Sequence, residues 1–228
     1  MYKKLIICLL LVNTAFMLQA QNYNWANKRF RKRSENTIVH SVNLSVGVYS
    51  PKMDYWNDIF LPASGSDGEF KSGLLLGGNI TFRIVEEFRA RVGATFWSDE
   101  VKESGVGFNR LDISFTRFSA GGFYVPKFAS FGDGFQGYAG FEMYYYDIKN
   151  ELDISSDSGI LNSGEQNGHD MAFAPVLGLE KVFGENILVG AEFSYVLGKY
   201  KQAEVEESTT FDVSVAGPQF TISVGYKF

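Results

Sequence analysis

Five charged residues stand within segments that otherwise alternate between apolar and polar side chains. Two are basic and three are acidic: Arg83, Arg91, Glu142, Glu180 and Glu192. If the apolar side chains of these segments face lipid, the charged ones point into the lumen of a barrel, which at eight strands is just wide enough for side chains to fill. Opposite charges should pair there, because an isolated charge in a poorly hydrated interior is costly. The pattern predicts a salt-bridge network that plugs the lumen; the alternative is a gated, narrow path for small solutes or protons.

Histidine chemistry has little support in the sequence. His40 comes just before the first expected strand, and His169 stands beside Asp170 in an expected outer loop. Ser158 and Ser163 are near in sequence, but closeness within a loop does not position a nucleophile and its base. Two histidines and no cysteine beyond residue 8 also leave few ligands for zinc. The sequence therefore predicts no catalytic residue, no metal site and no cofactor.

Two groups of residues are candidates for contact with a partner. In the first long connection, aromatic residues accompany Asp54 and Asp58; they are Tyr55, Trp56 and Phe60. These aromatic side chains could bind a partner, or they could pack over the barrel mouth and at the membrane interface. Near the N-terminus there are five basic residues, Lys28, Arg29, Arg31, Lys32 and Arg33. They could contact anionic headgroups or an acidic periplasmic partner, or form a solvated tail.

The elements that must position these residues are eight segments with a period of two, the repeat of a β-strand. Their expected bounds are Ser41–Tyr49, Leu74–Val85, Phe88–Trp97, Leu111–Val125, Phe135–Asp147, Met171–Val182, Ile187–Leu197 and Val213–Phe228. Nothing after residue 20 has the roughly 18 consecutive apolar residues of a transmembrane helix. Pro175 and Pro218 cannot donate to a strand ladder, so each is expected at a bulge or a strand entry.

Two of the eight segments do not fit a simple alternation. In the fourth, Leu111, Ile113 and Phe115 share one face, and continuing that phase would turn Arg117 toward lipid. A β-bulge near Arg117 would restore the pattern, and we predict one there. In the fifth, the consecutive tyrosines Tyr144 to Tyr146 are expected in the aromatic girdle at the outer interface.

The connections between the segments alternate in length. Long ones follow the first, third, fifth and seventh segments, at Ser50–Gly73, Ser98–Arg110, Ile148–Asp170 and Gly198–Asp212. Shorter ones follow the others, at Glu86–Glu87, Lys127–Gly134 and Phe183–Asn186. Bacterial barrels have long loops outside and short turns in the periplasm. Both ends of the mature chain are therefore expected in the periplasm.

The first 20 residues have the features of a secretory signal peptide. Lys3 and Lys4 precede an apolar run too short to span a bilayer, and a small residue stands at Ala20. Cleavage there leaves 208 of the 228 residues, without Cys8, the only cysteine. Removing the two lysines from 21 basic residues leaves 19 against 26 acidic, a net charge of about −7 that argues against nucleic acid as a partner. The expected organisation is a signal peptide over 1–20, a basic periplasmic tail over 21–40 and one barrel domain over 41–228.

The C-terminal residues alternate up to a terminal aromatic. Apolar residues at Phe220, Ile222, Val224, Tyr226 and Phe228 are separated by polar or small ones. With the signal peptide, the eight segments and the loop asymmetry, the ending Val224-Gly225-Tyr226-Lys227-Phe228 resembles the small outer-membrane β-barrel family that includes the OmpA transmembrane domain, OmpX and OmpW. The resemblance implies an all-β, up-and-down antiparallel barrel of eight strands in the outer membrane of a Gram-negative bacterium, with long extracellular loops and short periplasmic turns. It also implies that Tyr226 and Phe228 form a signal for the assembly machinery.

The resemblance implies a broad range of functions: envelope integrity, surface interaction or, in the OmpW-like branch, passage of small hydrophobic molecules. We predict a non-enzymatic structural and interaction protein of the envelope whose lumen is plugged. Its expected partners are outer-membrane lipid and lipopolysaccharide, the assembly machinery, and a protein of an envelope complex. A narrow channel or OmpW-like transporter is the alternative. A secreted lipocalin-like barrel, which would turn its apolar side chains inward, is disfavoured by the charged residues in mid-segment.

Overall fold

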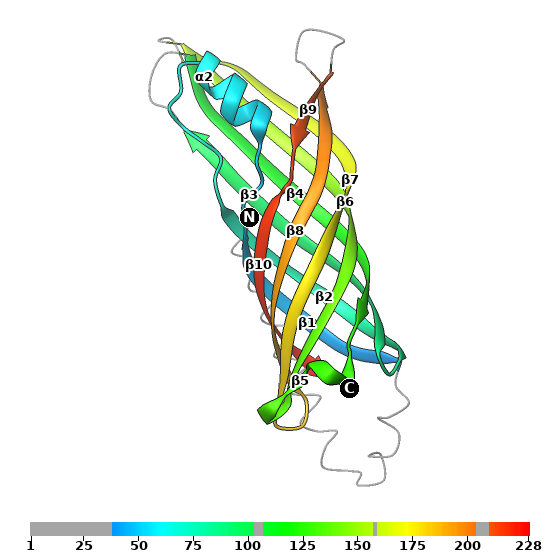
Figure 1. Cartoon of the computed structure of the whole chain (residues 1–228). Coiled ribbons are helices and arrows are strands. Elements are labelled where there is room, and N and C mark those ends of the chain that lie inside the picture. The colour runs from blue at the N-terminus through cyan, green and yellow to red at the C-terminus, as the bar shows by residue number, and fades with distance from the viewer. Residues whose placement is uncertain (1–37, 103–106, 157–158, 204–209) are drawn as a thin grey trace. The chain divides into compact units, whose positions relative to one another are not determined.

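The computed structural model describes residues 38–102, 107–156, 159–203 and 210–228 (Figure 1). The expected signal peptide and the five basic residues of the expected tail lie outside these ranges, and so do residues 103–106, 157–158 and 204–209. The first strand begins at Val39, slightly before the expected Ser41, so that His40 belongs to the barrel wall. No helix in the described ranges is long and apolar enough to cross a membrane.

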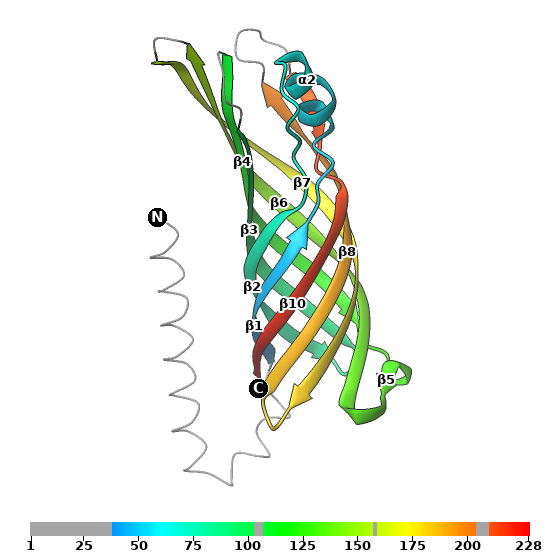
Figure 2. The same ribbon diagram turned by 90° about the vertical axis from the view of Figure 1, so that its left-hand side faces the viewer.

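The described residues form a closed antiparallel β-barrel, as predicted (Figures 1 and 2). Its wall has eight strand positions, which we call staves. Its strands are β1 (Val39–Tyr49), β2 (Gly73–Val85), β3 (Phe88–Lys102), β4 (Gly107–Tyr124), β6 (Phe135–Ser156), β7 (Gly159–Phe183), β8 (Ile187–Ala203) and β10 (Gly217–Lys227). The barrel closes because β10 pairs with both β1 and β8. β9 (Thr210–Ser214) continues the β10 stave outward along β8, and β5 (Ser130–Phe131) pairs with the start of β6.

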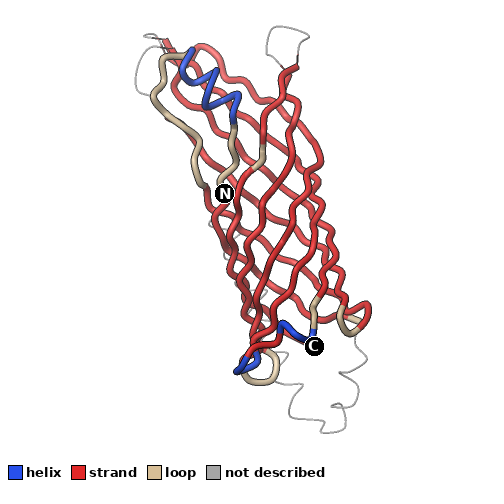
Figure 3. The backbone as a smooth tube through the Cα atoms, viewed as in Figure 1, coloured by secondary structure: helices blue, strands red, loops and turns tan. Residues whose placement is uncertain are grey.

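Short helices occur only in the connections of the described chain (Figure 3). The π-helical turn η3 (Trp56–Phe60) and α2 (Leu61–Ala63) lie in the first outer connection, residues 50–72, which we call loop 1. The 3-10 turns η4 (Lys127–Ala129) and η5 (Gly132–Gly134) flank β5 at the opposite end of the barrel.

The outer wall of the barrel is apolar, and the alternation of each strand explains why. Side chains at every second position point outward, and in β1 and β10 these are Val42, Leu44, Val46, Val48, Phe220, Ile222 and Val224. Each of them is 37–49% exposed. Their neighbours Ser41, Asn43 and Thr221 point inward and are buried. An apolar exterior around a polar interior is the arrangement of a barrel whose solvent is lipid.

The outer connections differ from the prediction, because the strands continue well beyond the apolar belt. β6 runs to Ser156 and β7 starts at Gly159, so that most of the expected loop Ile148–Asp170 is a β-hairpin. β3 and β4 likewise pair as far as Lys102 and Arg110. These hairpins are held by their own ladders and by apolar side chains on the inner face, such as the buried Ile148.

The predicted bulge near Arg117 is wrong. β4 pairs with β3 in a continuous register from Tyr124 to Arg110. Leu111, Ile113 and Phe115 point inward and are fully buried, and Arg117 lies on the same inner face. The reason is that the outer half of the lumen is apolar rather than polar. Side chains therefore still alternate between the two faces of β4, but in its outer half the apolar ones point into the lumen instead of outward.

The expected tyrosine girdle is also partly wrong. Tyr145 is 45% exposed on the outer wall, whereas Tyr144 and Tyr146 are buried in the lumen at 2% and 1%. Three consecutive residues of a strand cannot all face lipid, because alternate side chains point to opposite faces.

Both prolines lie beside Tyr195 on the outer wall. Pro218 is the second residue of β10 and pairs with Tyr195 of β8, which agrees with a strand entry. On the other side of β8, the β7 ladder passes from Phe173 to Val176 and omits Ala174 and Pro175. The register is unchanged across this gap, so Pro175 interrupts the ladder without a bulge.

Candidate functional site

The lumen of the barrel holds more buried charged side chains than any other part of the described residues. Across its middle, Arg91 forms ion pairs with Glu142 and Glu192, and we call these three residues the ion-pair ring. Arg91 of β3 donates its Nε to Glu142 of β6 at 2.9 Å and its Nη2 to Glu192 of β8 at 3.0 Å. A second guanidinium nitrogen also contacts Glu192. Tyr138 of β6 donates its hydroxyl to Glu192, and Tyr144 donates to Glu142 at 2.7 Å. One guanidinium thus joins staves from opposite sides of the barrel.

A second set of charges lies closer to the periplasmic end. Arg89 donates to Glu180 of β7 at 2.7 Å, and Nε2 of His40 lies 3.8 Å from the same carboxylate. Arg83 places its Nη2 3.5 Å from Nδ1 of His40. These four side chains come from four strands, β1, β2, β3 and β7, so that they connect the wall around most of its circumference.

Very little space remains among these polar side chains. The cavity that they line has a volume of about 20 Å³. That is room for about one water molecule. Its lining includes Arg89, Arg91, Tyr138, Glu180 and Glu192. Glycines make this packing possible: a Cβ on Gly121 would stand 2.7 Å from Cγ of Glu142, closer than two such atoms can approach.

Arg117 forms the next layer outward, and it is fully buried. Its guanidinium donates to neutral oxygens, namely Thr95 Oγ1 at 2.9 Å, Tyr146 OH at 3.2 Å and Gln219 Oε1 at 2.9 Å. It also lies 4.9 Å from the ring centre of Tyr49 and 4.8 Å from that of Tyr144. Hydrogen bonds and aromatic faces thus replace water around a cation.

We expect Arg117→Met to leave the barrel at least as stable as the unmutated chain. The partners of Arg117 are neutral, so removing the guanidinium leaves no buried charge uncompensated, and the cost of desolvating this cation disappears. Arg117→Ala should destabilise, because it leaves a cavity in addition to the three neutral oxygens that lose their donor in both variants. Urea unfolding in lipid vesicles measures both. A loss of more than about 2 kcal/mol for the methionine variant would contradict the expectation.

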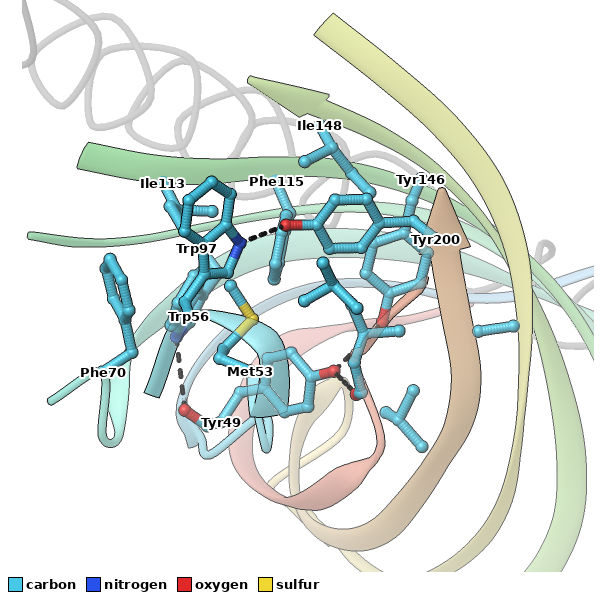
Figure 4. Close-up of a cluster of buried hydrophobic side chains, with 14 of the residues drawn as sticks. Tyr49, Met53, Trp56, Phe70, Trp97, Ile113, Phe115, Tyr146, Ile148 and Tyr200 are labelled. Carbon is cyan, nitrogen blue, oxygen red and sulfur yellow. Dashed lines mark hydrogen bonds between the residues drawn. The ribbon is translucent and has the colours of Figure 1, made fainter. Parts of the chain in front are cut away.

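The outer half of the lumen is filled by an apolar cluster that loop 1 completes (Figure 4). Trp97 of β3 stacks on Phe115 of β4 with ring centres 4.7 Å apart, and its Nε1 donates to the Tyr49 carbonyl at 3.2 Å. From loop 1, Trp56 donates its Nε1 to the Tyr200 hydroxyl at 2.8 Å. Other buried members are Met53, Leu61, Phe70, Leu111, Ile113, Tyr146 and Ile148.

Loop 1 is fastened at several points above this cluster. Asn57 donates its side-chain amide to the carbonyls of Lys52 and Phe70, each at 3.0 Å, and accepts from the Phe70 N–H at 2.8 Å. The Ser214 N–H donates to Asp54 at 2.7 Å. Met53 has a φ of 50° and is fully buried, a left-handed conformation that is unusual outside glycine. The loop therefore folds into the mouth as an ordered plug.

The structure separates the residues that the sequence suggested for partner contact. Trp56 is 5% exposed, which agrees with packing over the barrel mouth rather than with contact to a partner, the other reading of the sequence. Tyr55 and Phe60 are partly buried against the same cluster, where Tyr55 stacks on Phe211 at 3.4 Å. The basic residues Lys28, Arg29, Arg31, Lys32 and Arg33 lie outside the described residues. At the C-terminus, Tyr226 and Phe228 contact each other edge to face at 5.0 Å.

The two histidines are in unrelated places. His40 is buried at the periplasmic end beside Arg83 and Glu180. His169 lies in the outer part of β7 and stacks on Tyr145 with ring centres 6.1 Å apart. Among the described residues, no group of three or more acidic, histidine or cysteine side chains is arranged to hold a metal ion.

Several residues of the lumen were missed at the sequence level. Arg89 and Tyr138 share the inner phase of their strands with predicted charges, and Gln219 shares that of Thr221, so alternation alone would have found them. Arg117 was not predicted in the lumen, because Leu111, Ile113 and Phe115 share its face of the strand and were expected to face lipid. Trp56 and Met53 belong to a connection, and no periodicity shows that a connection folds inward.

Comparison with known proteins supports the fold. No protein-family model and no curated protein sequence matches the chain. Among solved structures, Neisserial surface protein A is similar with a TM-score of 0.51 and 13% identity, covering 83% of this chain and 96% of that one. The N-terminal barrel of Pseudomonas aeruginosa OprF (TM-score 0.45, 17% identity, 83% and 98% covered) is also similar, as is Yersinia pestis Ail with sucrose octasulfate (0.47, 14%, 83% and 99%).

The fold and the apolar belt define the class of this protein. It is a small eight-stranded outer-membrane β-barrel, and its place is the outer membrane. Its lumen holds the ion-pair ring around Arg91 and the loop 1 plug.

Proposed function

We propose that this barrel is a non-conducting structural and interaction protein of the cell envelope. The observation that carries the proposal is that the lumen is filled at two levels by different chemistry. The ion-pair ring around Arg91 fills the middle, and the apolar cluster with loop 1 fills the outer half. A hydrated ion crossing the barrel would have to displace both.

The two levels depend on different parts of the chain, and Tyr144 joins them, because it belongs to the cluster and donates to Glu142 of the ring. The ring depends on side chains of β3, β6 and β8 that belong to the wall itself. The cluster depends on loop 1, whose removal would leave the ring intact. An open loop 1 would therefore not by itself produce a continuous path.

The outer hairpins supply the surface for interaction. Their outward side chains are charged, and pairs of opposite sign lie close together: Arg110 with Asp112 at 2.7 Å, Lys102 with Glu100 at 2.7 Å, and Lys149 with Glu151 at 2.7 Å. A surface with both signs just beyond the apolar belt suits the phosphates and bridging cations of lipopolysaccharide. We propose lipopolysaccharide as the partner of this surface, and Tyr226 with Phe228 as the residues presented to the assembly machinery.

One observation favours the second candidate, a transporter with a lateral opening. Pro175 and Pro218 flank Tyr195 and weaken the wall on both sides of β8. Inside the wall at this level, however, lie Val196 and Ala174, which are fully buried in the apolar cluster. A lateral route would therefore open into packed side chains rather than into a hydrated lumen.

Single-channel recording in planar bilayers tests the proposal. We expect no conductance steps from the intact protein and none from a variant in which residues 54–69 of loop 1 are replaced by a short glycine and serine linker. We expect steps only when that replacement is combined with Arg91→Ala, because the outer level then loses loop 1 and the middle level loses its central cation. Steady conductance from the intact protein would instead establish the channel alternative.

A further inference from the structure

The periplasmic connection between β4 and β6 carries the most conspicuous unexplained feature of the described surface. We call residues Pro126–Gly134 the aromatic turn; it contains η4, β5 and η5. Phe128 in this turn is 83% exposed, more than any other large apolar side chain of the described residues, and Phe131 is 59% exposed. Two such side chains in water would be unfavourable. The turn is also ordered, since Ser130 and Phe131 pair with Gln136 and Phe135.

The aromatic turn lies against the outer side of the wall rather than under the lumen. Gly137 of β6 pairs with Leu179, whose side chain is exposed on the apolar exterior, so Gly137 also faces outward. A Cβ placed on Gly137 would stand 3.3 Å from Cβ of Ala129 and 3.5 Å from the Phe131 ring. The turn thus bends back over the face that meets lipid, and in Figure 2 β5 projects sideways from the barrel end.

The surroundings of the turn are those of a membrane interface. Phe88 and Tyr124 contact each other with ring centres 5.1 Å apart on the adjacent outer wall. Next to them the wall has an apolar depression of about 820 Å³, whose lining includes Tyr124, Ala139 and Leu177. The turn therefore continues a surface that already contacts lipid, and aromatic residues are enriched at this depth.

Two lysines at the turn fit anionic headgroups. Lys181 lies 4.4 Å from the ring centre of Phe135 and 5.2 Å from that of Phe183. Lys127 is exposed and lies 3.0 Å from Glu86, and this hydrogen bond raises the pKa of the Lys127 ammonium. The Lys181 ammonium, beside these two rings, can reach phosphates while the rings stay among hydrocarbon.

We propose that the aromatic turn is a phospholipid-binding foot, which inserts Phe128 and Phe131 into the headgroup boundary of the periplasmic leaflet. The partner is glycerophospholipid, recognised by apolar insertion together with lysine contacts to phosphate. The inference requires only that the barrel lies in a membrane, and it is independent of whether the lumen conducts. The foot fixes the depth of the barrel on one side, beneath β4 and β6.

Spin labels at single cysteines test this insertion. In a Cys8→Ser background, the only thiol is removed, so Phe128→Cys can be labelled with a nitroxide in vesicles of phosphatidylethanolamine and phosphatidylglycerol. Phe141→Cys, on the outer wall, is the lipid reference, and Glu185→Cys, in the β7–β8 turn, is the aqueous reference. Collision rates with oxygen and with a water-soluble nickel complex are measured at each position.

We expect the oxygen-to-nickel ratio at Phe128→Cys to be several-fold higher than at Glu185→Cys and to approach that at Phe141→Cys. Phe131→Cys is read by the same criterion if the first variant does not fold. A ratio no higher than that at Glu185→Cys would overturn the proposal and would indicate that the turn projects into the periplasm, where its phenylalanines would face a protein partner.

Discussion

Arg91→Met is expected to destabilise the barrel by about 3–5 kcal/mol, because it leaves two buried carboxylates without their shared cation. Glu142, which is 7% exposed, would keep only the Tyr144 hydroxyl as a donor. Glu192, which is partly buried, would keep only the Tyr138 hydroxyl. Methionine fills much of the same volume, so a lost contact surface cannot account for an effect of this size. Urea unfolding of the barrel in lipid vesicles, followed by tryptophan fluorescence and heat-modifiable gel mobility, measures the change.

Two further variants separate charge from packing. Adding Glu142→Gln and Glu192→Gln to Arg91→Met should restore most of the lost stability, because no uncompensated charge then remains. Glu151→Gln removes an exposed partner of Lys149 and should change stability by less than about 1 kcal/mol. If Arg91→Met and Glu151→Gln shifted the midpoint equally, the ring around Arg91 would not be a significant source of stability.

The sequence predicts which residues of this ring face the lumen, but it does not predict which of them form pairs. Alternation identifies the inner face of each strand, and it places Arg91, Glu142 and Glu192 there without any structure. The pairs that form depend on the stagger of the strands around the barrel. Arg91 of β3 reaches Glu192 of β8 across the lumen, and no pattern within either strand encodes that contact.

The fold was predictable, whereas the polarity of its outer half was not. Eight staves, their order and their closure follow from alternation and connection length, and they are confirmed. Leu111 to Phe115 were expected to face lipid, because apolar residues in a barrel strand normally do. Beyond the belt the exterior is water and the interior holds loop 1, so the same alternation has the opposite orientation. A period of two does not show whether the apolar side chains point into the lumen or away from it.

The contribution of loop 1 was beyond sequence reasoning for a different reason. Its aromatic residues allowed both an exposed contact and packing over the mouth, and composition does not decide between them. The decision depends on partners far away in the chain, such as Tyr200 for Trp56 and Ser214 for Asp54. The inner face of the hairpins offers an apolar floor, and the loop is long enough to cover it.

Trp97→Ala is expected to cost about 3–5 kcal/mol, the other large effect, because a buried tryptophan cannot be removed without leaving a cavity. Trp97 is fully buried, stacks on Phe115, meets Tyr49 edge to face at 6.0 Å and donates to the Tyr49 carbonyl. It stands at the base of the apolar cluster, where the wall offers no other group to fill the space. Unfolding in urea within lipid vesicles provides the measurement, and Ile59→Ala, at a side chain that is 57% exposed on loop 1, is the matched control with an expected change below about 0.5 kcal/mol.

Comparing Trp97→Ala with Trp56→Ala shows whether loop 1 unfolds with the barrel. Both side chains belong to one cluster, but Trp97 is anchored in β3 and Trp56 in a connection. If the plug opens locally before the wall unfolds, Trp56→Ala will increase protease cleavage within loop 1 and leave the urea midpoint nearly unchanged. If the plug and the wall unfold together, both variants will lower the midpoint by similar amounts. We expect the second result, because Asn57 and Asp54 fasten the loop to itself and to the β9 end of the wall. Cleavage in loop 1 at an unchanged midpoint would contradict it and would make the outer filling a movable lid over the Arg91 ring.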